Sequence, residues 1–290
     1  MLVTTREMLN HARDQGYAIG AFDAENAEMV WAIIAAAEEM CSPVIIQTTP
    51  GTLRYLSPAY FAGMVEKAAS ECRIPVALNL DHGNSATLAA QCISLGYTSI
   101  MIDGSALPYV ENISLSRKVC ELASIHGIPV EGELGTICGK EDDADTSAIS
   151  YTDPSQAADF VERTGVSSLA IAVGTAHGFY KLDPVLNLEL ISQVRIETGI
   201  PLVLHGASGL SDDVIKEAIK RGISKVNFAT DLRSAYTDAI RGYLANHPNA
   251  HDPKTYGEVA RCKAACVIRN KITICGCNGK AQYINPKSFA

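Results

Sequence analysis

Pro201–Arg221 is PLVLHGASGLSDDVIKEAIKR, and this stretch combines three patterns in order. A proline and three apolar residues lead to His205, and a loop of small residues follows. Ser211 then precedes two aspartates at the start of a segment with helical spacing, as an N-cap residue does. The stretch therefore predicts a buried strand, a polar turn and a helix.

The same unit recurs along the chain, in which eight apolar runs stand out. Pro43, Pro75 and Pro129 also open runs, and proline is tolerated at the first position of a strand. Nearly continuous apolar interiors are typical of parallel strands buried on both faces. The predicted strands are Ala18–Asp23, Pro43–Thr48, Pro75–Asp81, Ser99–Asp103, Pro129–Gly135, Ser168–Gly174, Pro201–Gly206 and Lys225–Thr230.

Helical patterns follow each of these strands. Alternating strands and helices of this number predict an α/β protein with a closed (β/α)8 TIM barrel. The alternative, an open doubly wound sheet, usually has G-x-G-x-x-G after its first strand, and that motif is missing here. The predicted helices are Glu25–Met40, Ser57–Cys72, Ser85–Leu95, Val110–His126, Pro154–Thr164, Leu188–Thr198, Ser211–Arg221 and Asp231–Leu244, with a last helix over Pro253–Asn270.

We predict one domain over residues 1–281 and a C-terminal tail over residues 282–290. The polar stretch Gly139–Ser150 (GKEDDADTSAIS) is expected to be a long loop after the fifth strand. Its acidic, apolar-poor composition buries little surface, so we expect it to be a lid that is mobile without ligand.

Composition narrows the class of protein. Of 290 residues, 47% are hydrophobic and 19% are charged, which is enough for a large core. The net charge of −8 argues against binding to nucleic acid, although backbone N–H groups can still bind a small phosphate. Neither a signal peptide nor an apolar run long enough to span a bilayer is found. Nine scattered cysteines fit reduced core thiols, so we expect a cytoplasmic protein.

Polar residues end six of the predicted strands, and α/β barrels build their active sites at these ends. His82, His177 and His205 stand at three of them. A lone histidine there is more often structural, but three histidines beside carboxylates favour a catalytic zinc with an open fourth position. Two further segments, Gly206–Gly209 and Asn227–Thr230, follow the seventh and eighth strands, where barrels often bind phosphate.

These residues resemble the class II, metal-dependent ketose-bisphosphate aldolases. The shared motifs are LDHG (Leu80–Gly83), MIDGS (Met101–Ser105), GELG (Gly132–Gly135), GTAHGFY (Gly174–Tyr180), LHGASG (Leu204–Gly209) and KVNFATDLR (Lys225–Arg233). Within the family the chain is most similar to the catalytic subunits of tagatose 1,6-bisphosphate aldolases. That likeness rests on TPGT (Thr49–Thr52), KEDD (Lys140–Asp143), NHP (Asn246–Pro248) and CGCNGKA (Cys275–Ala281).

The resemblance implies reversible cleavage of a ketose 1,6-bisphosphate to dihydroxyacetone phosphate and glyceraldehyde 3-phosphate, through an enediolate that zinc stabilises. It implies His82, His177 and His205 as zinc ligands, and Asp103 and Glu133 as groups that orient them. Asp81 would be the acid and base for the aldehyde half, and Glu141 would deprotonate dihydroxyacetone phosphate. The ketone-side phosphate, often with Na⁺ or K⁺ nearby, would lie on Gly178, Gly206, Ala207, Ser208, Asn227, Phe228, Ala229 and Thr230.

Two more residues are candidates for the site, Lys181 and Asp23, the latter where the family usually has asparagine. The family also implies a homodimer or homotetramer and, for this branch, a companion non-catalytic subunit. The nearest alternative is a fructose 1,6-bisphosphate aldolase, but Ala229 stands where those relatives often have aspartate. A metal-dependent hydrolase could use the same barrel, but the two phosphate loops argue against it. An inactive assembly subunit would be expected to have lost some of the metal ligands, which are all present here. No Schiff-base lysine is required, and Lys225 opens the eighth strand at the opposite end.

Overall fold

The computed structural model describes residues 1–141, 144–146, 150–178, 180 and 184–284. Eight parallel strands close into a barrel in the order β1-β11-β10-β8-β5-β4-β3-β2, with β2 and β11 pairing on either side of β1. The predicted TIM barrel is confirmed, and each predicted strand is present. The strands are β1 (Ile19–Asp23), β2 (Val44–Thr48), β3 (Val76–Gly83), β4 (Ser99–Ile102), β5 (Val130–Leu134), β8 (Ser168–Ile171), β10 (Leu202–Leu204) and β11 (Ile223–Phe228).

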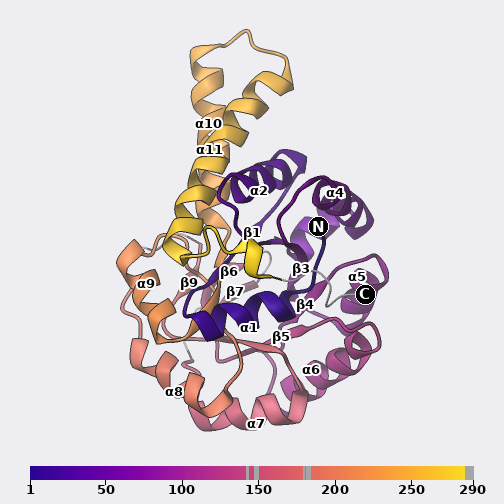
Figure 1. Ribbon diagram of the computed structural model, residues 1–290, viewed down its shortest axis with the longest axis vertical. Helices are drawn as coiled ribbons and strands as arrows, with labels where there is room; N and C mark the ends of the chain where they lie inside the picture. The colour runs from indigo at the N-terminus through magenta and orange to yellow at the C-terminus, as the bar shows by residue number, and fades with distance from the viewer. Residues whose placement is uncertain (142–143, 147–149, 179, 181–183, 285–290) are drawn as a thin grey trace.

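Helices surround the barrel (Figure 1). Side chains of Ser85, Asp153 and Ser211 accept a backbone N–H at the first turn of their helices, as N-caps do, whereas Ser57 makes no such bond. The helices that follow barrel strands are α2 (Ala27–Glu39), α3 (Pro50–Tyr55), α4 (Pro58–Glu71), α5 (Ala86–Ser94), α6 (Tyr109–Ser124), α7 (Pro154–Thr164), α8 (Leu188–Thr198), α9 (Asp212–Arg221) and α10 (Thr230–Asn246).

The two ends of the chain add helices that the repeat does not contain. Helix α1 (Thr5–Gln15) covers the end of the barrel where the strands begin, and its Thr5 hydroxyl lies 2.9 Å from that of Ser99 at the start of β4. Helix α11 (Pro253–Cys275) packs against α10, and the two project from the barrel as an arm (Figure 1). A short 3-10 helix, η1 (Ala281–Tyr283), follows and runs across the predicted domain boundary at residue 281. That boundary stays a prediction.

The polar segment after β5 differs from the predicted loop. It contains β6 (Cys138–Glu141) and β7 (Ala144–Thr146), which pair with each other, and β6 also pairs with β9 (Ala176–His177). Strand pairing satisfies backbone hydrogen bonds without burying side chains, so a polar sequence does not prevent it. Gly139 lies opposite His177 with φ 103°, and a Cβ there would lie 2.3 Å from the His177 carbonyl oxygen.

The expectation of core thiols is correct only in part. Cys92, Cys275 and Cys277 are buried, whereas Cys41, Cys262 and Cys266 are exposed. Cys262 and Cys266 lie on the outer side of α11, where four-residue spacing places both on one exposed face. Within the described residues no cysteine takes part in a disulfide or a metal-binding cluster, and no helix is apolar and long enough to cross a membrane.

Candidate active site

Most of the predicted site residues meet in one pocket at the carboxyl ends of the barrel strands. The pocket holds about 300 Å³ of space not filled by atoms, counted out to its open mouth. Residues from β1, β3, β11 and the segments after β8 and β10 contribute to it. Its lining consists of Asp23, Asp81, His82, His177, Gly178, His205, Gly206, Ser208, Asn227, Ala229 and Thr230.

The other predicted residues lie elsewhere. Ala207 and Phe228 are buried beneath the pocket surface, and the Phe228 ring stacks on Phe22 with 5.6 Å between ring centroids. Only their backbone groups are therefore available to a ligand. The backbone of Glu141 ends β6, but its side chain lies outside the described part of the structure, as does the whole of Lys181.

An irregularity at the end of β3 turns two consecutive side chains toward the site. Adjacent residues of a regular strand point to opposite faces. Here the pairing of β3 with β4 shifts register between Leu80 and Gly83, and His82 adopts the left-handed φ of 45°. That conformation costs a non-glycine residue about 1–2 kcal/mol. It lets Asp81 and His82 line one pocket together.

The three predicted histidines form a compact group. Ring centroids are 4.7 Å apart for His82 and His205, 5.0 Å for His82 and His177, and 6.0 Å for His177 and His205. One ring nitrogen from each residue lies within 4.8 Å of the other two. Burial, followed by the neighbouring imidazoles, lowers the pKa of His177 well below its usual value. Burial also lowers the pKa of His205. His177 and His205 are therefore neutral, the form that binds a metal. Burial acts in the same direction on His82, but the charges of Asp81 and Asp103 outweigh it and raise the pKa of His82.

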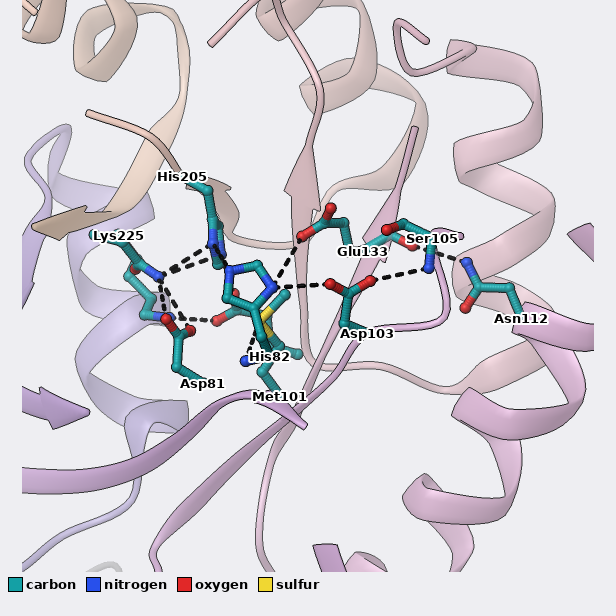
Figure 2. A network of polar contacts seen from close by, with 11 residues as sticks. Asp81, His82, Met101, Asp103, Ser105, Asn112, Glu133, His205 and Lys225 are labelled. Carbon is teal, nitrogen blue, oxygen red and sulfur yellow. Dashed lines mark hydrogen bonds and ion pairs between the residues drawn. The ribbon is translucent and has the colours of Figure 1, made fainter. Parts of the chain in front are cut away.

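Carboxylates set the orientation of two of these rings (Figure 2). His82 Nδ1 lies 2.8 Å from Asp103 Oδ2, and His205 Nε2 lies 2.9 Å from Glu131 Oε1. Because ionised carboxylates only accept hydrogen bonds, these nitrogens carry the protons. The nitrogens left to bind a metal are therefore His82 Nε2 and His205 Nδ1, which lie 3.0 Å apart. Burial raises the pKa of Asp103, but its bond with His82 and the charge of His82 outweigh burial and lower it.

Two ring nitrogens this close need a proton or a metal cation between them, so the pair can hold a proton in the metal-free chain and fits a metal ion. Tetrahedral zinc with bonds of about 2.0–2.1 Å would place ligand nitrogens about 3.3 Å apart, close to the separation found here. Metal-bound histidines commonly donate their second N–H to a carboxylate, as both rings do. The residues thus fit a zinc site held by three histidines.

Glu131 and Lys225 belong to this network but were not predicted as site residues from the sequence, which assigned Lys225 to the opposite end of the barrel. Sequence reasoning assigned ligand orientation to Asp103 and Glu133, yet Glu133 Oε2 is 3.9 Å from His82 Nδ1, and Glu131 holds His205. Lys225 Nζ lies 2.7 Å from Glu131 Oε2, inside the barrel. Both residues stand two positions before a predicted site residue on the same strand, Glu133 or Asn227. The period-2 alternation of strands was the available signal.

Asp81 is held beside the histidines by a neighbouring amide. Asn227 Nδ2 donates to Asp81 at 3.1 Å and 3.3 Å from its two carboxylate oxygens. The aspartate is 3% exposed and lines the pocket, so one face of its carboxylate is available to a substrate. A carboxylate fixed in this way beside a metal site is suited to moving a proton.

The loop after β10 is fixed against the segment that carries His177. Gly206 has φ 64°, and a Cβ there would lie 2.5 Å from the Ala176 carbonyl oxygen, so only glycine fits. The Tyr180 hydroxyl donates to the Gly206 carbonyl at 2.7 Å and accepts from the Ala176 N–H at 2.9 Å. Asp231 N–H donates to Ser208 Oγ at 3.3 Å at the start of α10. Both predicted phosphate segments thus meet at one rim of the pocket.

Asp23 lines the pocket and belongs to an ionic network. It is 2% exposed, accepts a bond of 3.0 Å from Gln47 Nε2, and lies 3.4 Å from Arg233 Nη2. Arg233 also donates to Glu25 at 2.7 Å. The negative charge introduced by aspartate in place of asparagine is therefore partly compensated by Arg233.

A parallel eight-stranded barrel with three imidazoles and an acidic residue at its mouth, beside two small-residue loops, is the architecture of a metal-dependent barrel enzyme. A sequence profile of the family described as fructose-bisphosphate aldolase class-II matches residues 3–280. The chain therefore belongs to this family and is a metal-dependent aldolase.

Solved structures agree with that assignment. The YdjI aldolase from Escherichia coli K12 is 39% identical, with a TM-score of 0.87, and the match covers 97% of this chain and 100% of the other. A candidate fructose-1,6-bisphosphate aldolase from Coccidioides immitis is 28% identical, with a TM-score of 0.88 over 95% and 97% of the two chains. The fructose-bisphosphate aldolase of Campylobacter jejuni, 24% identical over 96% and 97% with a TM-score of 0.81, has the same fold.

Proposed function

We propose that this aldolase reversibly cleaves a ketose 1,6-bisphosphate, preferentially tagatose 1,6-bisphosphate, to dihydroxyacetone phosphate and glyceraldehyde 3-phosphate. One observation carries the proposal. The metal-binding nitrogens of His82, His177 and His205 meet in the same pocket as Asp81 and two loops suited to phosphate. A metal-dependent hydrolase would need no such pair of loops.

The cofactor proposed for the histidine cluster is zinc, one ion per chain. When bound, zinc would act as a Lewis acid on the ketone and hydroxyl oxygens of the substrate. Asp103 and Glu131 keep the second nitrogens of His82 and His205 protonated and so aim the metal-binding nitrogens at one point. A monovalent cation near the phosphate loops is part of the proposal.

Asp81 and Glu141 would share the proton transfers. In the cleavage direction Asp81 takes the proton from the hydroxyl of the carbon that becomes the aldehyde. The carbon–carbon bond then breaks, and its electron pair remains on the ketone half as an enediolate. Glu141 returns a proton to that carbon, which completes dihydroxyacetone phosphate. Glu141 is a reasonable donor because β6 pairs directly with β9, which contains His177.

The loops would hold the ketone-side phosphate through backbone N–H groups. Gly178, Gly206, Ser208, Asn227, Ala229 and Thr230 all line the pocket. Thr230 begins α10, so the positive end of that helix dipole faces the same rim. The pocket can thereby bind an anion although the chain as a whole is negatively charged.

Ala229 supports the choice of tagatose 1,6-bisphosphate, and Asp23 is the other residue of the pocket expected to affect the choice of sugar. Ala229 lines the pocket without a carboxylate, whereas Asp23 supplies a buried one at the end of the neighbouring strand, β1. Tagatose and fructose 1,6-bisphosphate differ in the configuration of one hydroxyl group. That hydroxyl would therefore meet a different hydrogen-bond acceptor in this pocket than in one with aspartate at position 229. Fructose 1,6-bisphosphate is the second candidate because it names the family and the relative from Coccidioides immitis.

We also propose that the chain forms a homodimer or homotetramer, with a companion non-catalytic subunit as a further partner. The arm supports this, because only Leu232 of the 17 residues in α10 is buried in the single chain. The alternative of an inactive assembly subunit is disfavoured by the intact cluster of His82, His177 and His205.

A cleavage assay with both sugars tests the proposed function. We expect purified zinc-loaded protein to release dihydroxyacetone phosphate from tagatose 1,6-bisphosphate with a higher kcat/KM than from fructose 1,6-bisphosphate. A chelator should remove activity toward both sugars, and added zinc should restore it. A preference for fructose 1,6-bisphosphate would contradict the substrate assignment. Full activity after complete removal of the metal would contradict the mechanism.

A further inference from the structure

We propose that Lys225 and Glu131 form a buried pair that positions His205 for metal binding and strengthens zinc affinity. The inference rests on the proposed zinc site. It gives Lys225, which does not line the pocket, a role that acts through Glu131, whose contact with His205 is part of the proposed zinc site.

The three side chains form a continuous chain of contacts inside the barrel. Lys225 Nζ donates to Glu131 Oε2 at 2.7 Å, and the other oxygen of Glu131 lies 2.9 Å from His205 Nε2. Lys225 is 1% exposed, Glu131 3% and His205 1%. The lysine therefore cannot act on a substrate directly, and any effect on the site must pass through Glu131.

The pair spans the interior of the barrel rather than joining neighbouring strands. Glu131 lies on β5 and Lys225 on β11, and β8 and β10 stand between them in the barrel order. Ala170 of β8 and Val203 of β10 pair with each other and belong to a small apolar cluster separate from the main core. These short side chains leave room for the lysine to reach across.

A charged lysine is a costly way to fill a barrel interior. Removing two charges from water costs several kcal/mol per ion before their attraction is counted, and apolar residues of similar volume often stabilise a protein as well or better. Packing alone therefore gives no reason for Lys225 at this position. The need to fix the orientation of the Glu131 carboxylate does give a reason.

His82 is held in the same way as His205, but a different donor fixes its carboxylate. Asp103 contacts His82 through Oδ2, and its other oxygen accepts the Ser105 backbone N–H at 2.9 Å. In each case one carboxylate oxygen holds a histidine and the other is fixed by a donor. Glu131 has no loop N–H in this role, since Lys225 Nζ provides the donor instead.

The pair determines which nitrogen of His205 is available to a metal. A carboxylate held in this position accepts a hydrogen bond from Nε2, so the proton stays there and the lone pair of Nδ1 faces His82 Nε2 at 3.0 Å. Without Lys225 the carboxylate is free to turn. Loss of such an outer contact typically lowers metal affinity about 10- to 100-fold.

The test is zinc affinity, measured by competition with a chromophoric chelator at fixed pH. Lys225→Met is expected to weaken zinc binding about 10- to 100-fold. The matched control is Lys271→Met, which removes another buried lysine, 2.7 Å from Asp231 Oδ2 and outside the histidine network. The control should bind zinc as the wild type does.

A second variant guards against failure to fold. Lys225→Met combined with Glu131→Gln leaves no unpaired buried charge, and glutamine can offer His205 either a donor or an acceptor. It should fold and still bind zinc more weakly. In zinc-free protein, ¹⁵N NMR should show the His205 proton on Nε2 in the wild type and on both nitrogens in exchange in this double variant.

The outcomes separate this inference from the proposed function. Wild-type protein that binds no zinc would contradict the zinc site itself. Zinc binding in the wild type with unchanged affinity in the Lys225 variants would contradict only the positioning role. Equal weakening in Lys271→Met would also overturn it, because a general loss of stability would then explain the effect.

Discussion

Asp81→Ala is expected to lower the turnover of ketose bisphosphate cleavage by about 10²- to 10⁴-fold, the usual contribution of a positioned acid or base. The carboxylate lies beside the histidine cluster, is aligned by Asn227, and faces the pocket. Asp81 is not one of the three proposed zinc ligands, so zinc should stay bound in the variant. Steady-state cleavage rates and metal content, measured on the same preparation, give the result.

Asp14→Ala is a suitable control, because this aspartate lies on α1 at the opposite end of the barrel, is 57% exposed and pairs with Arg13. It should leave both quantities unchanged. Asp81→Ala protein that cleaves substrate at the wild-type rate would remove the acid and base role from Asp81. Loss of zinc together with activity would show that the residue supports the metal instead.

Glu141→Gln should abolish exchange of the dihydroxyacetone phosphate proton with solvent, again by about 10²-fold or more, while zinc remains bound. Glutamine keeps the size of the side chain but cannot take up a proton. The exchange is followed by NMR in D₂O with dihydroxyacetone phosphate alone, so it isolates this step from the action of Asp81 on the aldehyde half.

Asp143→Asn changes a charge two residues along the same acidic segment and should exchange the proton at nearly the wild-type rate. Normal exchange in Glu141→Gln would mean that the acidic residues of Gly139–Ser150 only solvate this segment. Charge runs usually have that role.

The barrel and its histidines were predictable because their signals are local. Each strand carries its own apolar run, and the closed parallel sheet follows from the number of repeats. His82, His177 and His205 could be assigned to one mouth because strand ends of a barrel meet there. The distances between them, and the left-handed turn at His82, required three-dimensional packing.

The lysine–glutamate pair was not predicted because its two residues are 94 positions apart in sequence and join strands that are not neighbours. Lys225 opens the strand predicted from the sequence, a position that suggests the end of the barrel away from the site. A long side chain nevertheless reaches Glu131 across the interior, and strand periodicity shows which face it points to but not how far it extends.

The small sheet was missed for a different reason. Hydrophobic periodicity detects strands with one buried face, and β6 and β7 have few apolar residues. Their pairing depends on backbone groups and on the partner strand at His177. Both helices of the arm were predicted from the sequence, but their projection from the barrel depends on packing between α10 and α11.

Metal content is the most direct test of the account. Protein purified without added metal and analysed by elemental analysis should contain about one zinc per chain. His205→Ala should contain almost none and should cleave no bisphosphate, because His205 supplies one of the three nitrogens that meet in the pocket. Wild-type protein without zinc, or His205→Ala with full zinc and full activity, would contradict the claim that these three histidines form the catalytic metal site.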